Sequence, residues 1–237
     1  MSMGTTEMNA GLTILAVLVV NVSFFFLAGG LFHWWFQRLD VNRWRHQPSK
    51  QQTRAMMLEK LPLVFTNAII LNIMMGIGVA YGSRYGRAYW GIGTRGVPYF
   101  LFSTAALFIF YHGALYYFHR TMHRPALFRR FHHLHHKYKA PMFLDALYEH
   151  PFEAFYGGCV VIAPLFLFPV SYFGFFFFLS VMGAHEIIDH SGFKVNLPLL
   201  SPSLSHDDHH RRSNVYYGQL LPLLDDAHGT VVRSKAS

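Results

Sequence analysis

Three long segments without charged side chains limit what this chain can fold into. They cover residues 11–36, 62–81 and 97–118, with the histidines in them taken as neutral. About 20 consecutive apolar residues are needed for a helix to cross the hydrocarbon core of a bilayer. Charged residues make up only 14% of the chain, whereas soluble domains usually contain about 25%. The sequence therefore predicts an integral membrane protein with three long spanning helices.

A fourth apolar segment, residues 151–181, is interrupted by Pro164 and Pro169. Proline ends or kinks a helix because it lacks the backbone N–H and its ring clashes with the preceding turn. Each half has about 16 residues, which gives roughly 24 Å of helix. We therefore expect a short helical hairpin that enters the membrane without fully crossing it. A hairpin returns the chain to the side from which it came.

The first apolar segment differs from a cleaved signal peptide. No basic region precedes it, it is too long, and Phe and Trp stand where cleavage would need small residues.

We expect a single membrane domain over residues 1–237. The one cysteine, Cys159, allows no disulfide framework and is expected to be a buried apolar residue.

Basic residues are distributed unevenly around the predicted spans. Six lie between the first two spans: Arg38, Arg43, Arg45, Lys50, Arg54 and Lys60. Six follow the third span: Arg120, Arg124, Arg129, Arg130, Lys137 and Lys139. Because short loops rich in Lys and Arg stay in the cytoplasm, we expect residues 38–61 and 119–141 on the cytoplasmic face and the N-terminus outside. The membrane would be the endoplasmic reticulum or the bacterial inner membrane.

The chain carries a formal net charge of +8. This excess is explained by membrane orientation and by contact with anionic lipid headgroups. A nucleic-acid partner is not expected, because the sequence contains no soluble basic module.

Histidines are concentrated in three clusters with helical spacing. Six of the 23 residues in 119–141 are histidine. The first cluster has i, i+4 spacing and the other two have i, i+3, i+4 spacing: His119 and His123; His132, His135 and His136; His206, His209 and His210. On a helix each set lies on one face. His133 is one residue out of phase, so its ring is expected to point away.

These histidines exceed the four ligands of a tetrahedral zinc site and suit a pair of metal ions. Imidazole alone does not select among iron, zinc, copper and nickel. A chance polar face would explain one cluster, but three clusters on one side of the membrane favour metal binding. The isolated His33, His46 and His228 are expected not to be ligands.

Further polar residues are candidates for completing the metal site. His190 is favoured as a ligand, and it shares a helix face with Glu186. The other candidates for ligands or for the residues around them are His150, His185, Glu186, His112, Glu153, Asp189 and Asp207, with Asp145, Glu149 and Asp208 nearby in sequence. Carboxylates are included because a ligating histidine usually donates its second N–H to one. His112 is expected deeper in the membrane, beside the metal site or in a substrate pocket.

Five motifs in order give the sequence a family resemblance. "HRTMH", "FHHLHHKYKAP", "HPFE", "DHSGF" and "HDDHH" resemble the fatty acid hydroxylase/sterol desaturase superfamily, as does "LLDDAHGT" near the end. The similarity covers roughly residues 98–230. It implies an all-α integral membrane bundle, with a cytoplasmic helical cap that holds a dimetal centre.

The resemblance also implies a ligand set and cofactors. By position the ligands would be His119, His123, His132, His135, His136, His190, His206, His209 and His210. The family implies two iron ions, O₂ as co-substrate, and two electrons. Because no cytochrome b5-like haem domain is recognised, we expect a separate electron-transfer protein of the cytochrome b5, ferredoxin or reductase type. Glu149 and the polar "HEIIDH" depart from the family pattern and leave the lipid substrate open.

Oxidation of an unactivated C–H bond needs a redox-active metal, which excludes zinc and favours iron. We therefore expect a hydroxylase acting on a sterol, fatty acyl or isoprenoid lipid, with desaturation on the same site as the alternative. A membrane zinc-binding or zinc-transport protein is a hypothesis of another class, but a transporter is expected to hold its ligands near the bilayer midplane. A bis-histidine haem protein would need paired histidines on facing spans, and the predicted spans contain few.

Overall fold

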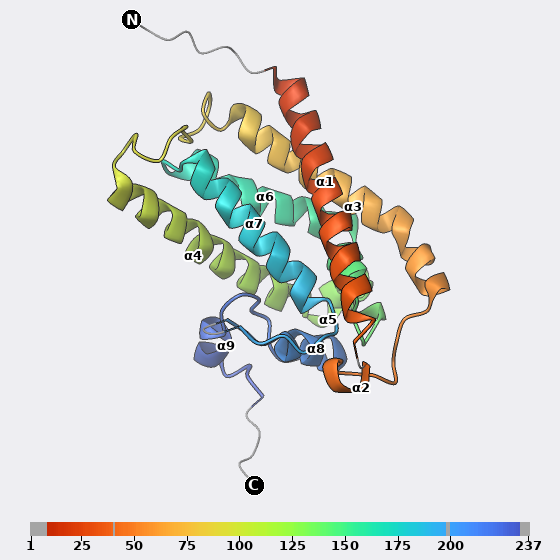
Figure 1. Cartoon of the computed structure of the whole chain (residues 1–237). Coiled ribbons are helices and arrows are strands. Elements are labelled where there is room, and N and C mark those ends of the chain that lie inside the picture. The colour runs from red at the N-terminus through yellow and green to blue at the C-terminus, as the bar shows by residue number, and fades with distance from the viewer. Residues whose placement is uncertain (1–8, 40, 198–199, 233–237) are drawn as a thin grey trace, which may run out of the picture.

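A computed structural model describes residues 9–39, 41–197 and 200–232 of the chain. Within these ranges every regular element is a helix, in agreement with the predicted all-α class. The long helices are α1 (Ala10–Phe36), α3 (Arg54–Tyr81), α4 (Val97–Met122), α6 (Pro151–Leu167) and α7 (Tyr172–Asp189). Figure 1 shows that they run roughly alongside one another and form one bundle.

Short helices gather at one end of this bundle. They are α2 (Val41–Trp44), α5 (Pro125–Leu127), η1 (Phe128–His132), η2 (His135–Lys137), η3 (Phe143–Leu147), α8 (Ser203–Arg212) and α9 (Leu223–His228). Figure 1 shows α2, α5, α8 and α9 together at this end, which we call the cap, whereas α1 begins at the opposite end. The bundle therefore has one end that is distinguished by the cap.

Apolar side chains between neighbouring helices hold the bundle together. Helix α1 packs against α3, α3 packs against α6, and α4 packs against both α6 and α7. Leu107, Leu165 and Phe175 are fully buried in the core between these helices. Gly158 of α6 lies so close to α3 that an added Cβ would meet the Met74 side chain at 2.8 Å. A glycine is therefore needed for the close approach of α3 and α6.

The outer surface of the bundle is apolar. On α1 only Gly29 is buried, and the side chain of Ile109 on α4 is 72% exposed. A soluble bundle would not present apolar residues around whole helices. Helices α1, α3, α4 and α7 are long and apolar enough to cross a membrane, and α6 is shorter. The fold is thus an all-α membrane bundle. The expected hairpin is present as α6 and α7, but α7 is long enough to cross a membrane, which differs from the expected short half.

Three helices extend beyond the predicted apolar segments, and one of them is α4, which continues past residue 118 to Met122. Helix α3 begins at Arg54 because the Thr53 hydroxyl accepts a hydrogen bond from the Met56 amide at 3.3 Å. Lys60 therefore lies in α3, fully buried and paired with Asp145, and its expected place in a basic loop was wrong. Helix α7 continues to Asp189, past the end of the apolar segment.

The histidine-rich segment after α4 is helical, but it is not one regular α-helix as its spacing suggested. Residues Phe128–His132 form a π-helix, and His135–Lys137 form a 3₁₀ helix. The rotation per residue differs between these two forms. The C-terminal cluster does lie on an α-helix, α8.

Candidate metal centre

The structure brings nine histidines together in two adjacent groups beneath the bundle. The five-histidine group contains His119, His123, His132, His136 and His209, and the four-histidine group contains His135, His190, His206 and His210. Within each group one nitrogen of every ring lies within 4.8 Å of the others. These are the nine residues that the family resemblance had singled out as ligands.

Helix ends place these rings in the cap. His119 lies in the last turn of α4 and His123 is its C-cap, while His190 is the C-cap of α7. Helices η1 and η2 place His132 and His136, which are four residues apart, in the five-histidine group and His135 in the four-histidine group. Helix α8 contributes to both groups.

The Nε2 atoms of the rings face one another. In the five-histidine group, Nε2 of His119 lies 3.1 Å from that of His132 and 3.3 Å from that of His123. In the four-histidine group, Nε2 of His206 lies 2.9 Å from that of His190 and 3.1 Å from that of His210. Two nitrogens bound at right angles to one ion, each at about 2.1 Å, would be about 3.0 Å apart. The spacing therefore fits ligands that share a metal ion.

Hydrogen bonds on the outer side of the rings fix which nitrogen carries the proton. Nδ1 of His119 donates to the Tyr217 carbonyl at 2.9 Å, and Nδ1 of His209 donates to the Val215 carbonyl at 2.7 Å. Nδ1 of His190 donates to the Glu186 carbonyl at 3.1 Å. A neutral imidazole with its proton on Nδ1 has a lone pair on Nε2. Lone pairs that converge on one point repel unless a cation lies between them, so the donor set also fits metal ions.

Burial keeps these imidazoles neutral. Together with smaller effects of neighbouring groups, it lowers the pKa of His136 and that of His190 to about 3. Burial likewise holds the pKa values of His206 and His209 well below the ordinary value for histidine. Metal ions bind the neutral form of imidazole. The rings are therefore ready to bind a metal at neutral pH without first losing a proton.

Among the additional candidates, Glu153 contacts a histidine of the two groups with its side chain. Its Oε2 atom lies against Nδ1 of His132, and both side chains are buried. This is the carboxylate–histidine contact that commonly orients a metal ligand. Glu186 holds His190 through its backbone carbonyl, and its carboxylate Oε2 lies 3.5 Å from Nδ1 of the same ring.

The remaining candidates lie outside both groups. His185 lies 3.3 Å from Asp189 rather than among the clustered rings. His150 caps α6 by accepting a hydrogen bond from the Phe152 amide at 3.1 Å. Asp207 accepts a hydrogen bond from Gln47 at 2.9 Å. His112 also lies outside the groups, as do His33, His46, His133 and His228.

Asp225 supports the site in a way that sequence analysis did not predict. Its carboxylate accepts hydrogen bonds from the backbone amides of Tyr217 and Gly218 at 2.8 and 2.7 Å, and from the Thr230 hydroxyl at 2.6 Å. Tyr217 in turn offers its carbonyl to His119. The only sequence signal was the closing "LLDDAHGT" motif, which gave no role for the aspartate.

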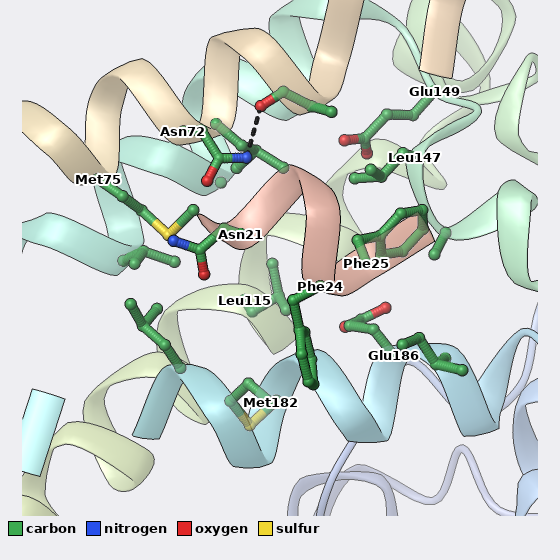
Figure 2. Close-up of a pocket in the computed structure, with 18 of the residues that line it drawn as sticks. Asn21, Phe24, Phe25, Asn72, Met75, Leu115, Leu147, Glu149, Met182 and Glu186 are labelled. Atoms are coloured by element: carbon green, nitrogen blue, oxygen red, sulfur yellow. Dashed lines mark hydrogen bonds between the residues drawn. The ribbon is translucent and has the colours of Figure 1, made fainter. Parts of the chain in front are cut away.

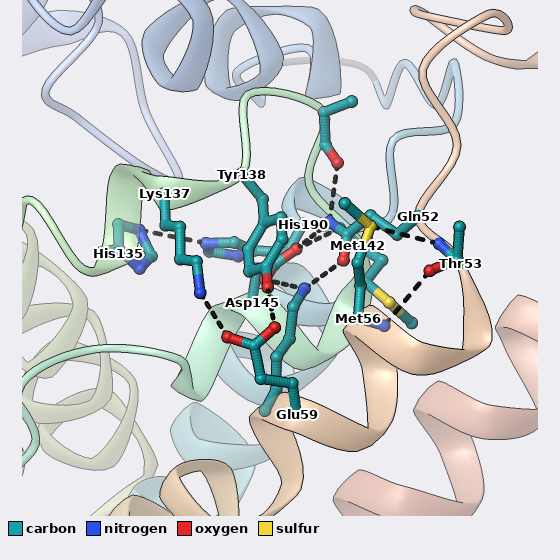
Figure 3. A network of polar contacts seen from close by, with 12 residues as sticks. Gln52, Thr53, Met56, Glu59, His135, Lys137, Tyr138, Met142, Asp145 and His190 are labelled. Atoms are coloured by element: carbon teal, nitrogen blue, oxygen red, sulfur yellow. Dashed lines mark hydrogen bonds and ion pairs between the residues drawn. The ribbon is translucent and has the colours of Figure 1, made fainter.

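A second polar network lies where the cap meets the bundle (Figure 3). The carboxylate of Asp145 binds the ammonium group of Lys60, accepts from Gln52 at 2.6 Å, and caps the Met142 amide at 2.8 Å. The Lys60 ammonium also lies over the Tyr138 ring, 3.9 Å from its centroid. This network ties α3 to the segment that carries η2 and η3.

A cavity of about 670 Å³ extends from the histidines into the bundle. Its walls come from α1, α3, α4, α6 and α7 and are mostly apolar, as Figure 2 shows for Phe24, Leu115 and Met182. His119, His132, His135, His190 and His206 lie on its wall. Figure 2 also shows Glu149 and Glu186 on the wall. The cavity therefore places histidines of both groups on the wall of a mostly apolar space that suits a lipid.

Comparisons with known proteins show the family of this chain. A family model described as fatty acid hydroxylase matches residues 104–230, more than half of the chain. Fatty acid hydroxylase ahd1 of Mycosarcoma maydis is 30% identical over 196 residues, covering 77% of this chain and 48% of that protein. The Delta(7)-sterol 5(6)-desaturase erg3A of Aspergillus fumigatus is 26% identical over 154 residues, covering 64% and 44%.

A putative methylsterol monooxygenase of Dictyostelium discoideum is 28% identical over 140 residues, covering 56% of this chain and 52% of that protein. The chain thus spans about half the length of the curated relatives it matches. No solved structure matches the chain. All nine clustered histidines lie within the matched segment. The chain belongs to the fatty acid hydroxylase/sterol desaturase superfamily of membrane enzymes.

Proposed function

We propose that this protein is a non-haem di-iron monooxygenase that hydroxylates a C–H bond of a lipid. One iron would be held by the five-histidine group and the other by the four-histidine group. The observation that supports this most is the convergence of the two groups of Nε2 atoms on the wall of an apolar cavity. A zinc transporter would need ligands along a path across the membrane, but these lie together at one end.

Iron would supply the redox chemistry that activates O₂, and the chain supplies the geometry around it. The overall reaction consumes O₂, two electrons, two protons and the C–H bond, and it yields an alcohol and water. The carbonyls of Tyr217 and Val215 hold His119 and His209 with their Nε2 atoms inward. Glu153 does the same for His132. Apolar walls keep bulk water from the reacting carbon and bind the hydrocarbon part of the lipid.

The substrate would be a sterol, fatty acyl or isoprenoid lipid that enters from the membrane. Hydroxylation is preferred because it requires one carbon to be positioned at the metal site. Desaturation would require a second hydrogen, on the adjacent carbon, to be removed with controlled geometry. It is the second candidate, because a sterol desaturase is among the relatives.

The cap would face the cytoplasm, at the endoplasmic reticulum or the bacterial inner membrane, as the distribution of Lys and Arg favours. Electrons would come from a separate protein of the cytochrome b5, ferredoxin or reductase type. A second pocket supports docking of this electron-transfer protein at the cap. It is lined by Arg120, Arg124 and His123. These arginines would attract an acidic partner.

The test supplies ¹⁸O₂ and an electron donor to the purified protein in lipid, and follows the product by mass spectrometry. One ¹⁸O atom in a new hydroxyl group supports the hydroxylase, and a product two mass units lighter without label indicates desaturation. Metal analysis should find two irons per chain without a haem absorption band. Full activity without O₂, or with zinc as the sole metal, would refute the proposal.

A further inference from the structure

Two asparagines lie on the wall of the cavity. Asn21 comes from α1 and Asn72 from α3. Figure 2 shows them toward one end of the cavity, whereas Glu149 and Glu186 lie toward the other. Met75 and Met182 contribute apolar wall near this end. Amide side chains among apolar walls inside a membrane are rare and usually functional.

Hydrogen bonds to the backbone determine how both amides are turned. Nδ2 of Asn21 donates to the carbonyl of Val17 at 2.9 Å, and Nδ2 of Asn72 donates to the carbonyl of Ala68 at 2.8 Å. Only the amide nitrogen can donate to a carbonyl, so the position of each Oδ1 atom follows. Each amide also keeps a second N–H. Each group can therefore accept one hydrogen bond and donate another.

Asn72 carries a buried hydrogen-bond acceptor that is unpaired among the described residues. Its side chain is 6% exposed, and its Oδ1 atom has no hydrogen-bond partner among the described residues. A buried acceptor without a partner is unfavourable by about 1–3 kcal/mol in proteins. Asn pairs in membrane helices often bond to each other, but here both amides donate to their own helices instead. The free oxygen therefore suits a ligand in the cavity.

Helix geometry sets the depth of this site in the bundle relative to the cap. Val64 of α3 packs with Tyr138 and Met142 at the base of the cap. Asn72 lies eight residues farther along α3, which corresponds to about 12 Å. A group bound at Asn72 would thus lie about two helical turns farther into the bundle than Val64 at the base of the cap.

We propose that the lipid substrate carries a hydroxyl group, which Asn72 and Asn21 bind at the end of the cavity away from the cap. The hydroxyl donates to Oδ1 of Asn72 and accepts from a spare amide N–H. The site then orients the lipid so that oxidation takes place on a carbon distant from its hydroxyl. This inference rests on the proposed function, because it takes the cavity as the lipid site.

Direct binding measurements test the inference without turnover. Radiolabelled cholestan-3-ol, cholestan-3-one and cholestane are compared on the purified protein in nanodiscs, and so are 1-hexadecanol and hexadecane. In one of the two series the alcohol should bind about tenfold more tightly than the hydrocarbon, as expected for one buried hydrogen bond. The series in which this occurs distinguishes a sterol alcohol from a linear one. The ketone should bind less tightly than the alcohol, because it cannot donate to Oδ1.

Variants test whether the amides of Asn72 and Asn21 cause the preference for the alcohol over the hydrocarbon. Asn72→Leu and Asn21→Leu should lower the preference for the alcohol toward onefold while retaining binding of the hydrocarbon. Met75→Leu, a change of cavity wall without a polar group, is the matched control and should keep the tenfold preference. The comparison of probes on the unmodified protein remains valid even if Asn72→Leu fails to fold.

The outcomes separate this inference from the proposed function. Equal binding of alcohol and hydrocarbon in both series would overturn it and leave the amides a role in packing α1 against α3. Equal binding of ketone and alcohol would overturn the acceptor role of Asn72. Either result leaves the proposed function standing, because that depends on iron and ¹⁸O incorporation. Failure of all the probes to bind would count against the cavity as a lipid site and therefore against both.

Discussion

Nδ1 of His119 donates a hydrogen bond to the backbone carbonyl of Tyr217, 2.9 Å away. The Tyr217 amide in turn donates to Asp225, 2.8 Å away. A ring near the end of α4 is thus oriented by a carboxylate that lies more than one hundred residues later in the chain. Asp225 acts as a positioning residue, because it reaches the proposed metal site only through the backbone of Tyr217.

Replacing this carboxylate tests the positioning role. In Asp225→Asn an NH₂ group replaces one carboxylate oxygen. The backbone amide of Tyr217 or Gly218 then faces a donor and loses its hydrogen-bond acceptor. We expect a loss of about 1–3 kcal/mol in the free energy of unfolding and a lower iron content. Thermal unfolding in detergent and elemental analysis measure the two effects. Asp226→Asn is the control, because Asp226 is exposed, and equal effects of the two variants would contradict the prediction.

Two neighbouring histidines give a second test. His135→Ala removes a ring of the four-histidine group, whereas His133 is exposed and lies outside both groups. Loss of an indirect partner of a metal often lowers affinity or activity by 10–100-fold, so loss of a ligand should lower turnover by more than about 100-fold. His133→Ala should retain most of the activity and both irons. Equal losses in two folded variants would show that the buried rings do not hold the metal.

The sequence predicted the membrane bundle well because long apolar segments have few alternative folds. It also predicted that the histidine clusters would meet at one end, since a hairpin returns the chain to the same side. It placed Lys60 wrongly because its charge marked the end of an apolar segment. Only the buried partner Asp145, distant in sequence, explains why this charge belongs inside α3.

The division of the histidines into two groups follows their spacing, because residues four apart share a group: His119 with His123, His132 with His136, and His206 with His210. The middle histidine of each three-residue cluster, His135 or His209, joins the other group. The contacts of Tyr217 and Val215 were missed. They are made by backbone carbonyls, which every residue possesses and which therefore leave no signal in a sequence.

Acid should destabilise the metal-free protein. In the folded chain the pKa values of His136 and His190 are lowered to about 3, whereas unfolded histidine titrates near 6.5. Between these values the unfolded chain binds more protons, so the free energy of unfolding decreases as the pH falls below about 6.5. Each group contributes at most about 1.4 kcal/mol per pH unit.

Thermal unfolding of the metal-free protein measures this effect. The midpoint should be nearly constant above about pH 7 as far as these groups are concerned, and it should fall steadily toward about pH 5. His136→Gln should show a shallower decrease, because glutamine does not titrate. A midpoint that rises on acidification would contradict the burial of neutral imidazoles.

The ion pair of Lys60 and Asp145 allows a comparison of a buried pair with an exposed one. Both side chains of this pair are fully buried. Lys137 and Glu59 form a second pair nearby, with side chains 43% and 54% exposed. Figure 3 shows Asp145, Glu59 and Lys137 in the same polar network. The two lysines therefore differ mainly in burial.

Lys60→Met should reduce the free energy of unfolding by about 3–5 kcal/mol, because it leaves the carboxylate of Asp145 buried without a cation. Lys137→Met should change it by at most about 1 kcal/mol, since an exposed pair is stabilised only weakly. Adding Asp145→Asn to Lys60→Met should restore part of the loss by removing the unpaired charge. Denaturant unfolding in a mild detergent measures all three variants.

If the two single lysine variants were equally stable, the cap would not be attached to α3 through a buried charge. A double variant less stable than Lys60→Met alone would instead indicate that Asp145 acts mainly through its hydrogen bonds to Met142 and Gln52.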